Sequence, residues 1–220
     1  MKGNQPHIIT EQSREYRLGE VKGNQVIYNF DQMLVYLEAK GKSIFGDKFQ
    51  VHQKDIPVIY KLCNYMIGEE EKCKELEIDL HKGILLSGPV GCGKTTLMNL
   101  IRYIVPWQKA YQIIPCRNVT FGFNHIGYST IESFGNEQYY CFDDLGVEPL
   151  GKYHGKDSNV MGEVLLSRYD LFLAQQIRTH ATTNLNAEEL EERYGNRVYS
   201  RMRELFNLVA FDHKSKNKRT

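Results

Sequence analysis

The sequence lacks the features of a membrane-spanning or disulfide-rich secreted protein. No apolar run approaches the roughly 20 residues that cross a bilayer, and residues 1–6 show no hydrophobic signal segment. The five cysteines are an odd number and include no C-x-x-C pair, a pattern typical of reduced thiols. We therefore expect a cytoplasmic protein without a membrane partner.

The sequence also lacks a charge bias. Its 28 Lys and Arg residues nearly balance its 27 Asp and Glu residues, so the net charge of +1 argues neither for nor against nucleic acid. The seven histidines show no metal-ligand spacing. Only the C-terminal end is locally basic, with Lys214, Lys216, Lys218 and Arg219. Such an end is either solubilising or able to contact a phosphate backbone.

The strongest motif is a glycine-rich stretch at residues 88–96, which matches the P-loop pattern G-x-x-x-x-G-K-[ST]. Residues 84–86 before it predict a buried strand, and the apolar spacing behind it predicts a helix that stops at Pro106. Backbone N–H groups at such a helix start attract a triphosphate. Lys94 is predicted to reach the β- and γ-phosphates, and the Thr95 hydroxyl to bind Mg²⁺. The predicted nucleotide-binding residues are Gly88, Pro89, Gly91, Cys92, Gly93, Lys94, Thr95 and Thr96. The alternative is a chance glycine-rich turn.

A second chemical element follows the apolar run at residues 139–142, which predicts another strand. The run ends in Asp143 and Asp144. A carboxylate at such a strand end is where a P-loop ATPase holds Mg²⁺, so Asp143 is a predicted metal residue together with Thr95. Asp144 occupies the place of an acid that orients or activates the attacking water. An ordinary acidic turn is the alternative.

Three further polar positions are candidates. Residues 177–183 lead into Asn184, which is predicted to hold the attacking water or contact the γ-phosphate, with Thr183 as the next choice. Alternatively, Asn184 caps the helix that begins near Ala187. Arg197 and Arg201 share one face of that helix, where nearby glutamates offer salt bridges instead.

The rest of the chain carries less specific patterns. Residues 1–30 predict a loose arm or small hairpin, and residues 151–155 a glycine-flanked loop. A long helix from about residue 157 carries Arg168 on its apolar stripe, where the arginine either snorkels outward or points at a nucleotide or neighbouring subunit. The other predicted elements are a short helix from Asp31 that ends before Gly41, a helix from Asp55 to Gly68, a solvated charge run at 69–72, a strand at 111–114, a helix within 118–134 and a closing strand at 206–211.

Together, the motifs at 88–96, 139–146, 182–185 and 194–203 resemble the DnaC/IstB-like branch of AAA+ ATPases, which are helicase loaders and transposition helpers. The resemblance covers roughly residues 80–213 and implies an α/β P-loop fold of the AAA+ (ASCE) type. That fold has a five-stranded parallel sheet in the order 5-1-4-3-2 between helices. Too few residues follow Asn184 for the usual C-terminal helical lid. The implied organisation is an N-terminal extension at 1–50, an ATPase core at 51–213 and a basic tail at 214–220.

The resemblance also implies a function. ATP and Mg²⁺ would bind at the subunit junctions of a homo-oligomer, and an arginine of one subunit would complete the site of the next. Arg201 is the first choice for that arginine and Arg197 the second. The expected activity is a nucleotide switch that hydrolyses ATP on DNA or on a helicase, transposase or nuclease. Asp144 stands where typical AAA+ proteins have Glu, so a weakly hydrolysing ATP-bound adaptor is the main alternative. A P-loop kinase for a small acceptor is a further one.

Overall fold

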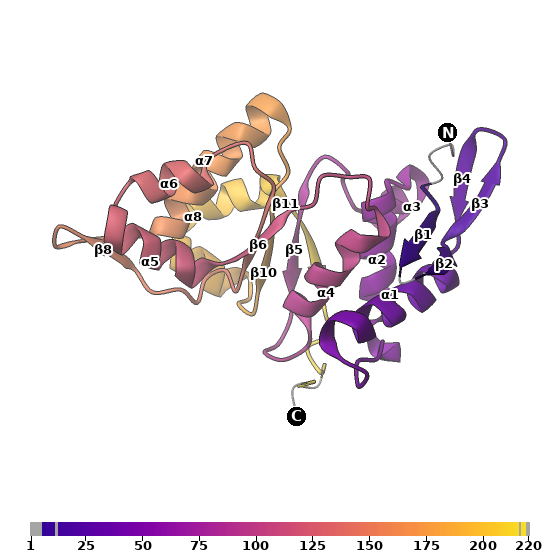
Figure 1. Ribbon diagram of the computed structural model, residues 1–220. Coiled ribbons are helices and arrows are strands. Elements are labelled where there is room, and N and C mark those ends of the chain that lie inside the picture. The colour runs from indigo at the N-terminus through magenta and orange to yellow at the C-terminus, as the bar shows by residue number, and fades with distance from the viewer. Residues whose placement is uncertain (1–5, 12, 216, 219–220) are drawn as a thin grey trace. The chain divides into compact units, whose positions relative to one another are not determined.

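The computed structural model describes residues 6–11, 13–215 and 217–218 (Figure 1). The chain divides into two compact units. The first combines residues 1–78 with 96–110, and the second combines 79–95 with 111–220. Among the described residues, no helix is long and apolar enough to cross a membrane. The second unit holds almost all of the predicted site residues.

The first unit begins with two antiparallel hairpins. β1 (Ile8–Glu11) pairs with β2 (Arg14–Arg17). β3 (Gly19–Lys22) pairs with β4 (Gln25–Tyr28). The segment predicted as a loose arm or small hairpin therefore forms two short hairpins in its described part.

Helices make up the rest of the first unit. They are α1 (Phe30–Phe45), η1 (Gln53–Asp55), α2 (Ile56–Ile67) and α3 (Glu70–Glu75), followed after the P-loop by the later part of α4 (Lys94–Ile101) and η2 (Arg102–Ile104). The predicted end of the first helix before Gly41 is wrong, because α1 runs on to Phe45. A Cβ at Gly41 would lie 2.1 Å from the Phe49 ring. The glycine inside α1 therefore lets the Phe49 ring pack directly against the helix backbone. The charge run predicted as a solvated face or loop contributes to α3.

The second unit is built on a five-stranded sheet in which every paired strand is parallel. The strands are β5 (Gly83–Ser87), β6 (Gln112–Pro115), β7 (Tyr140–Asp143), β10 (His180–Thr183) and β11 (Phe206–Ala210). Their order is β11-β5-β10-β7-β6, which reads 5-1-4-3-2 when these five are numbered along the chain. Ser87 aligns with both Thr183 and Ala210. The carboxyl ends of the strands therefore meet at one edge, where α/β proteins bind ligands.

Four helices of this unit group together beside the sheet (Figure 1): α5 (Cys116–Ile126), α6 (Ser129–Phe134), α7 (Val160–Gln175) and α8 (Ala187–Leu205). Their buried apolar residues pack against alternate strand residues, among them Leu85, Phe142 and Ala181. The predicted glycine-flanked loop is instead a hairpin of β8 (Gly151–Tyr153) and β9 (Lys156–Ser158). After β11, the described residues of the tail form no helix.

Arg168 of α7 is completely buried and fits neither of its two predicted roles. Its Nε donates to Thr179 Oγ1 at 2.8 Å, its Nη1 donates to the Asn136 carbonyl, and its guanidinium lies 5.4 Å from the centre of the Tyr140 ring. Thr179 directly precedes β10, and Tyr140 begins β7. The side chain therefore lies at the amino ends of the strands, opposite the edge that carries the P-loop. Burial lowers its pKa to about 10, which leaves it charged at neutral pH.

His180 is a buried histidine that bridges two strands. Its Nδ1 accepts a hydrogen bond from Ile84 N at 3.1 Å, and its ring lies 4.7 Å from the Tyr111 ring. Burial, together with the charges of Arg178 and Arg168, lowers its pKa to about 3. An unfolded histidine titrates near pH 6.5. Folding therefore disfavours protonation, and His180 costs stability as the pH falls below about 6.5.

We expect His180→Asn to flatten the acid dependence of stability. The Asn Oδ1 can accept the Ile84 N–H bond but does not titrate. Between about pH 7 and pH 5, the free energy of unfolding should fall by about 2 kcal/mol more in the wild type than in the variant. Urea unfolding followed by circular dichroism at both pH values measures this difference. Equal losses in the two proteins would contradict the prediction.

Candidate nucleotide-binding site

The P-loop follows β5, and α4 begins directly behind it at Lys94. Gly91 and Gly93 have φ of 81° and 101°, left-handed values that a side chain would strain. The Lys94 side chain is folded back onto the loop, where its Nζ donates to the carbonyls of Gly88 at 2.8 Å and Pro89 at 3.1 Å. Only 6% of this residue is exposed. The ammonium group is thus held at the loop by two neutral acceptors. A phosphate oxygen is a charged and therefore stronger acceptor, and it can take their place.

The fold brings Thr95 and Asp143 into direct contact. Thr95 Oγ1 lies 2.8 Å from Asp143 Oδ1 and 3.1 Å from Oδ2. Asp143 is the last residue of β7 and is buried. The two residues that the motifs predict as a metal pair are therefore adjacent, although 48 positions separate them in sequence.

These oxygens fit the preferences of Mg²⁺. It binds hard oxygen ligands and usually takes only one or two carboxylates, with water and phosphate completing its octahedron. Thr95 and Asp143 offer one hydroxyl and one carboxylate beside the start of α4. Within the described ranges, no group of three or more His, Cys, Asp or Glu side chains offers a metal cage made of protein alone. The donor set thus suits a cation shared with a bound phosphate.

Thr182 is a site residue that the sequence reasoning missed. Its hydroxyl donates to Asp143 Oδ1 at 2.7 Å and accepts from the Asp144 backbone N–H at 3.0 Å. It is completely buried in β10. The available signal was its place in the Thr-Thr-Asn run, but only the pairing of β10 with β7 shows which threonine faces the Asp143 carboxylate.

Asp144 has a left-handed backbone, with φ of 56°, which is unusual for a residue other than glycine. Two hydrogen bonds from β10 hold this turn: Thr182 Oγ1 accepts from Asp144 N, and Thr182 O accepts from Leu145 N at 2.8 Å. The Asp144 side chain itself is exposed. Its carboxylate is therefore available to a water molecule, while its backbone is fixed by the strand beside it.

Asn184 does not cap the following helix. That cap is Asn186, whose Oδ1 accepts from Glu189 N at 3.0 Å while Glu189 Oε2 accepts from Asn186 N at 2.7 Å. Thr183 is committed elsewhere, since its hydroxyl donates to the Leu145 carbonyl at 2.7 Å. Asn184 Oδ1 is buried and has no hydrogen-bond partner among the residues that the structure describes. A buried acceptor without a partner needs an explanation, and a bound water or ligand supplies one.

The two candidate arginines differ in their surroundings. Arg201 Nη1 lies 3.3 Å from Glu204 Oε1, and its guanidinium is 4.7 Å from the centre of the Tyr169 ring. Arg197 is exposed, and its side chain makes no hydrogen bond or ion pair within the described part of the chain. The salt-bridge alternative therefore describes Arg201 and not Arg197. Their role toward a neighbouring subunit stays a prediction.

The basic tail contacts the P-loop. Lys218 N donates to the Gly91 carbonyl at 2.9 Å, and Lys218 Nζ donates to the Cys92 carbonyl. Asn217 also lies against the loop, since a Cβ at Gly91 would meet its Oδ1 at 2.1 Å. Both Lys218 hydrogen bonds use carbonyl oxygens of the loop. Lys216, Arg219 and Thr220 of the predicted tail lie outside the described residues.

We expect Lys218→Ala to weaken ATP binding about threefold, because an exposed charge beside the loop adds a modest attraction for phosphate. Lys214→Ala is the matched control, since it removes an equal charge from an exposed tail residue. Titration calorimetry with Mg²⁺ and ATP compares the three proteins. Unchanged or tighter binding by Lys218→Ala would contradict the expectation and make the tail a bystander or a competitor.

Comparison with known proteins gives matches among solved structures only, since neither a family model nor a curated protein matches the sequence. The DnaC helicase loader matches with a TM-score of 0.55 and 18% identity, over 76% of this chain and 95% of that one. DnaI matches with a TM-score of 0.54 and 18% identity, over 76% and 89%. AMPPCP-bound DnaA from Aquifex aeolicus matches with a TM-score of 0.51 and 17% identity, over 74% and 48%. The chain therefore shares the α/β fold of these solved structures.

Proposed function

We propose that this protein binds ATP with Mg²⁺ at the P-loop and uses it as a switch on DNA or on a DNA-processing partner. The contact between Thr95 and Asp143 beside Lys94 is the observation that carries this proposal. It joins the two halves of a nucleotide–metal site from distant parts of the sequence. Among the matched structures, DnaA is described with AMPPCP and single-stranded DNA, and DnaC as a helicase loader.

Each residue has a distinct task in this proposal. Lys94 exchanges its loop carbonyls for phosphate oxygens, and Thr95 and Asp143 hold the metal. When bound, Mg²⁺ neutralises charge on the phosphates. Asp144 orients the attacking water from its exposed carboxylate, and the unpartnered Asn184 Oδ1 accepts a hydrogen bond from that water. Arg201 or Arg197 of a neighbouring copy completes the site.

Sedimentation of the purified protein tests the switch. Samples contain Mg²⁺ and a slowly hydrolysed ATP analogue, with or without single- or double-stranded DNA. We expect the complex to grow only with nucleotide, and this growth to be lost in Arg201→Ala or Arg197→Ala while the nucleotide still binds. A monomer under all conditions, with no ATPase activity, would contradict the proposed switch.

Asp144→Asn separates a hydrolysing switch from an ATP-bound adaptor. The adaptor is favoured by one observation, the short acid Asp144 in a fixed left-handed turn. For a switch, we expect the variant to bind ATP as tightly as the wild type and to hydrolyse it at least about 10-fold more slowly, since general acid–base groups contribute about 10²–10⁴. Phosphate release under single-turnover conditions measures this. A wild-type rate no higher than that of the variant would favour the adaptor.

A further inference from the structure

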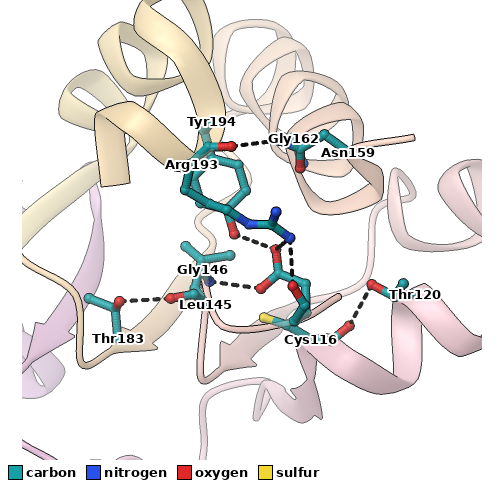
Figure 2. A network of polar contacts seen from close by, with 10 residues as sticks. Cys116, Thr120, Leu145, Gly146, Asn159, Gly162, Thr183, Arg193 and Tyr194 are labelled. Atoms are coloured by element: carbon teal, nitrogen blue, oxygen red, sulfur yellow. Dashed lines mark hydrogen bonds and ion pairs between the residues drawn. The ribbon is translucent and has the colours of Figure 1, made fainter. Parts of the chain in front are cut away.

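The loop after the two acids contains a buried carboxylate, Glu148, of which only 5% is exposed. Its Oε2 accepts from Gly146 N at 2.8 Å, and its Oε1 accepts from the Tyr194 hydroxyl at 2.7 Å. Arg193 Nη2 lies 3.4 Å from Oε1 and also donates to the Glu148 carbonyl (Figure 2). One carboxylate therefore holds the loop and α8 at the same time.

On the loop side, Glu148 completes the constraint that β10 begins. Asp144 and Gly146 have φ of 56° and 100°, so the chain makes two left-handed turns within three residues. Thr182 and Thr183 fix the first half of this loop through Asp144 and Leu145. The bond from Gly146 N to Glu148 fixes the second half. Such turns persist only where the surroundings hold them.

On the helix side, Glu148 is bonded to the two residues that precede a kink in α8. Arg193 and Tyr194 directly precede Gly195, whose φ of 75° and ψ of 159° interrupt the helical backbone of α8. The Arg193 carbonyl accepts from Asn159 Nδ2 at 2.9 Å, and Asn159 caps α7 by accepting from Gly162 N at 3.2 Å (Figure 2). The part of α8 beyond the kink carries Arg197.

We propose that Glu148 is a positioning residue that couples the nucleotide site to the part of α8 beyond Gly195. This inference rests on the proposed function, because it needs a nucleotide that shifts the loop at residues 143–146. Buried hydrogen bonds are costly to leave unmade, so a shift of Gly146 draws the Glu148 carboxylate with it. Tyr194 and Arg193 then follow, and Gly195 supplies the backbone freedom for the rest of α8 to turn.

Two conservative variants cut this link from opposite ends. Glu148→Gln removes the charge and one of the two acceptor atoms, and Tyr194→Phe removes the donor on the helix. Tyr36→Phe is the matched control, since it also removes a buried tyrosine hydroxyl that donates to a glutamate, here Glu11 at 2.8 Å in the first unit. A purely structural role would make all three variants behave alike.

Hydrogen–deuterium exchange with and without the Mg²⁺-bound ATP analogue provides the readout. In the wild type and in Tyr36→Phe, we expect nucleotide to slow exchange both at residues 143–148 and at 196–202. In Glu148→Gln and Tyr194→Phe, nucleotide should still slow exchange at residues 143–148. At residues 196–202, the slowing should fall from about fivefold to none. If Glu148→Gln does not fold, Tyr194→Phe decides the question alone.

The outcomes separate this inference from the proposed function. Nucleotide binding with an unchanged response at residues 196–202 in both link variants would overturn the coupling alone. A wild type that binds nucleotide without any response at 196–202 would overturn it as well. A wild type that binds no ATP analogue would overturn both the coupling and the proposed function.

Discussion

Lys94→Ala is expected to weaken ATP binding at least about 100-fold, which corresponds to about 2.7 kcal/mol. The ammonium group is buried at the P-loop, where it donates to the carbonyls of Gly88 and Pro89. Bound triphosphate would exchange these neutral acceptors for charged oxygens, and charged hydrogen bonds are about twice as strong as neutral ones. Alanine removes both the bond and the local positive charge.

Titration calorimetry with the slowly hydrolysed ATP analogue and Mg²⁺ measures this loss. Lys152→Ala is the control, because it removes an equal charge from an exposed position in the same unit. The midpoint of thermal unfolding without nucleotide should be nearly the same for the three proteins. In Lys94→Ala, water can donate to the loop carbonyls in place of the lysine. An affinity of Lys94→Ala within about threefold of the wild type would contradict a P-loop role for this lysine.

Arg168→Ala is expected to lower the free energy of unfolding by about 3–5 kcal/mol, the range of large buried side chains cut to alanine. Two effects oppose each other here. Removing a buried charge relieves its desolvation cost, which the lowered pKa of Arg168 reflects. The truncation also leaves a large cavity and strands Thr179 Oγ1 and the Asn136 carbonyl without their donor. We expect the cavity and the stranded acceptors to dominate.

Arg168→Met separates the two effects. Methionine fills most of the volume without burying a charge, so it should recover about half of the loss caused by alanine. Urea unfolding at neutral pH measures all three proteins, and nucleotide affinity should stay unchanged because Arg168 lies at the opposite edge of the sheet. A cost below about 1 kcal/mol for Arg168→Ala, or a specific loss of ATP binding, would contradict a structural role.

Local patterns predicted the elements of the second unit well. The strands around residues 84–86, 111–114 and 139–142, and the closing strand, all lie where apolar runs placed them. β5 and β7 are short and almost wholly buried, and buried parallel strands appear in a sequence as continuous apolar runs. The α/β fold that the family resemblance implied is confirmed by the five-stranded parallel sheet and by the solved structures that match.

Predictions from local patterns failed where the environment of a residue depends on a distant partner. Gly41 has the sequence signature of a helix end, yet it lies inside α1. A glycine is required there because the Phe49 ring occupies the position of a Cβ. Arg168 fits an apolar stripe, and its burial depends on Thr179 and Asn136, which only the folded unit brings to it. The glycine-flanked segment at 151–155 forms part of a hairpin, and its Lys152 N–H donates to Asn124 Oδ1 of α5, which is distant in sequence.

By itself, the sequence predicted the kind of chemistry at the candidate site. The P-loop, the paired acids and the Thr-Thr-Asn run are short, contiguous and tied to strand ends, and the family that they resemble implied a parallel sheet with these strand ends at one edge. Only the tertiary structure decided which side chains touch there. Strand pairing selected Thr182 as the partner of Asp143, and chain packing brought Glu148 to Tyr194 and Lys218 to the P-loop. The physical reason is that such contacts depend on strand register and burial. Both arise from the whole fold and produce no recognisable pattern in the local sequence.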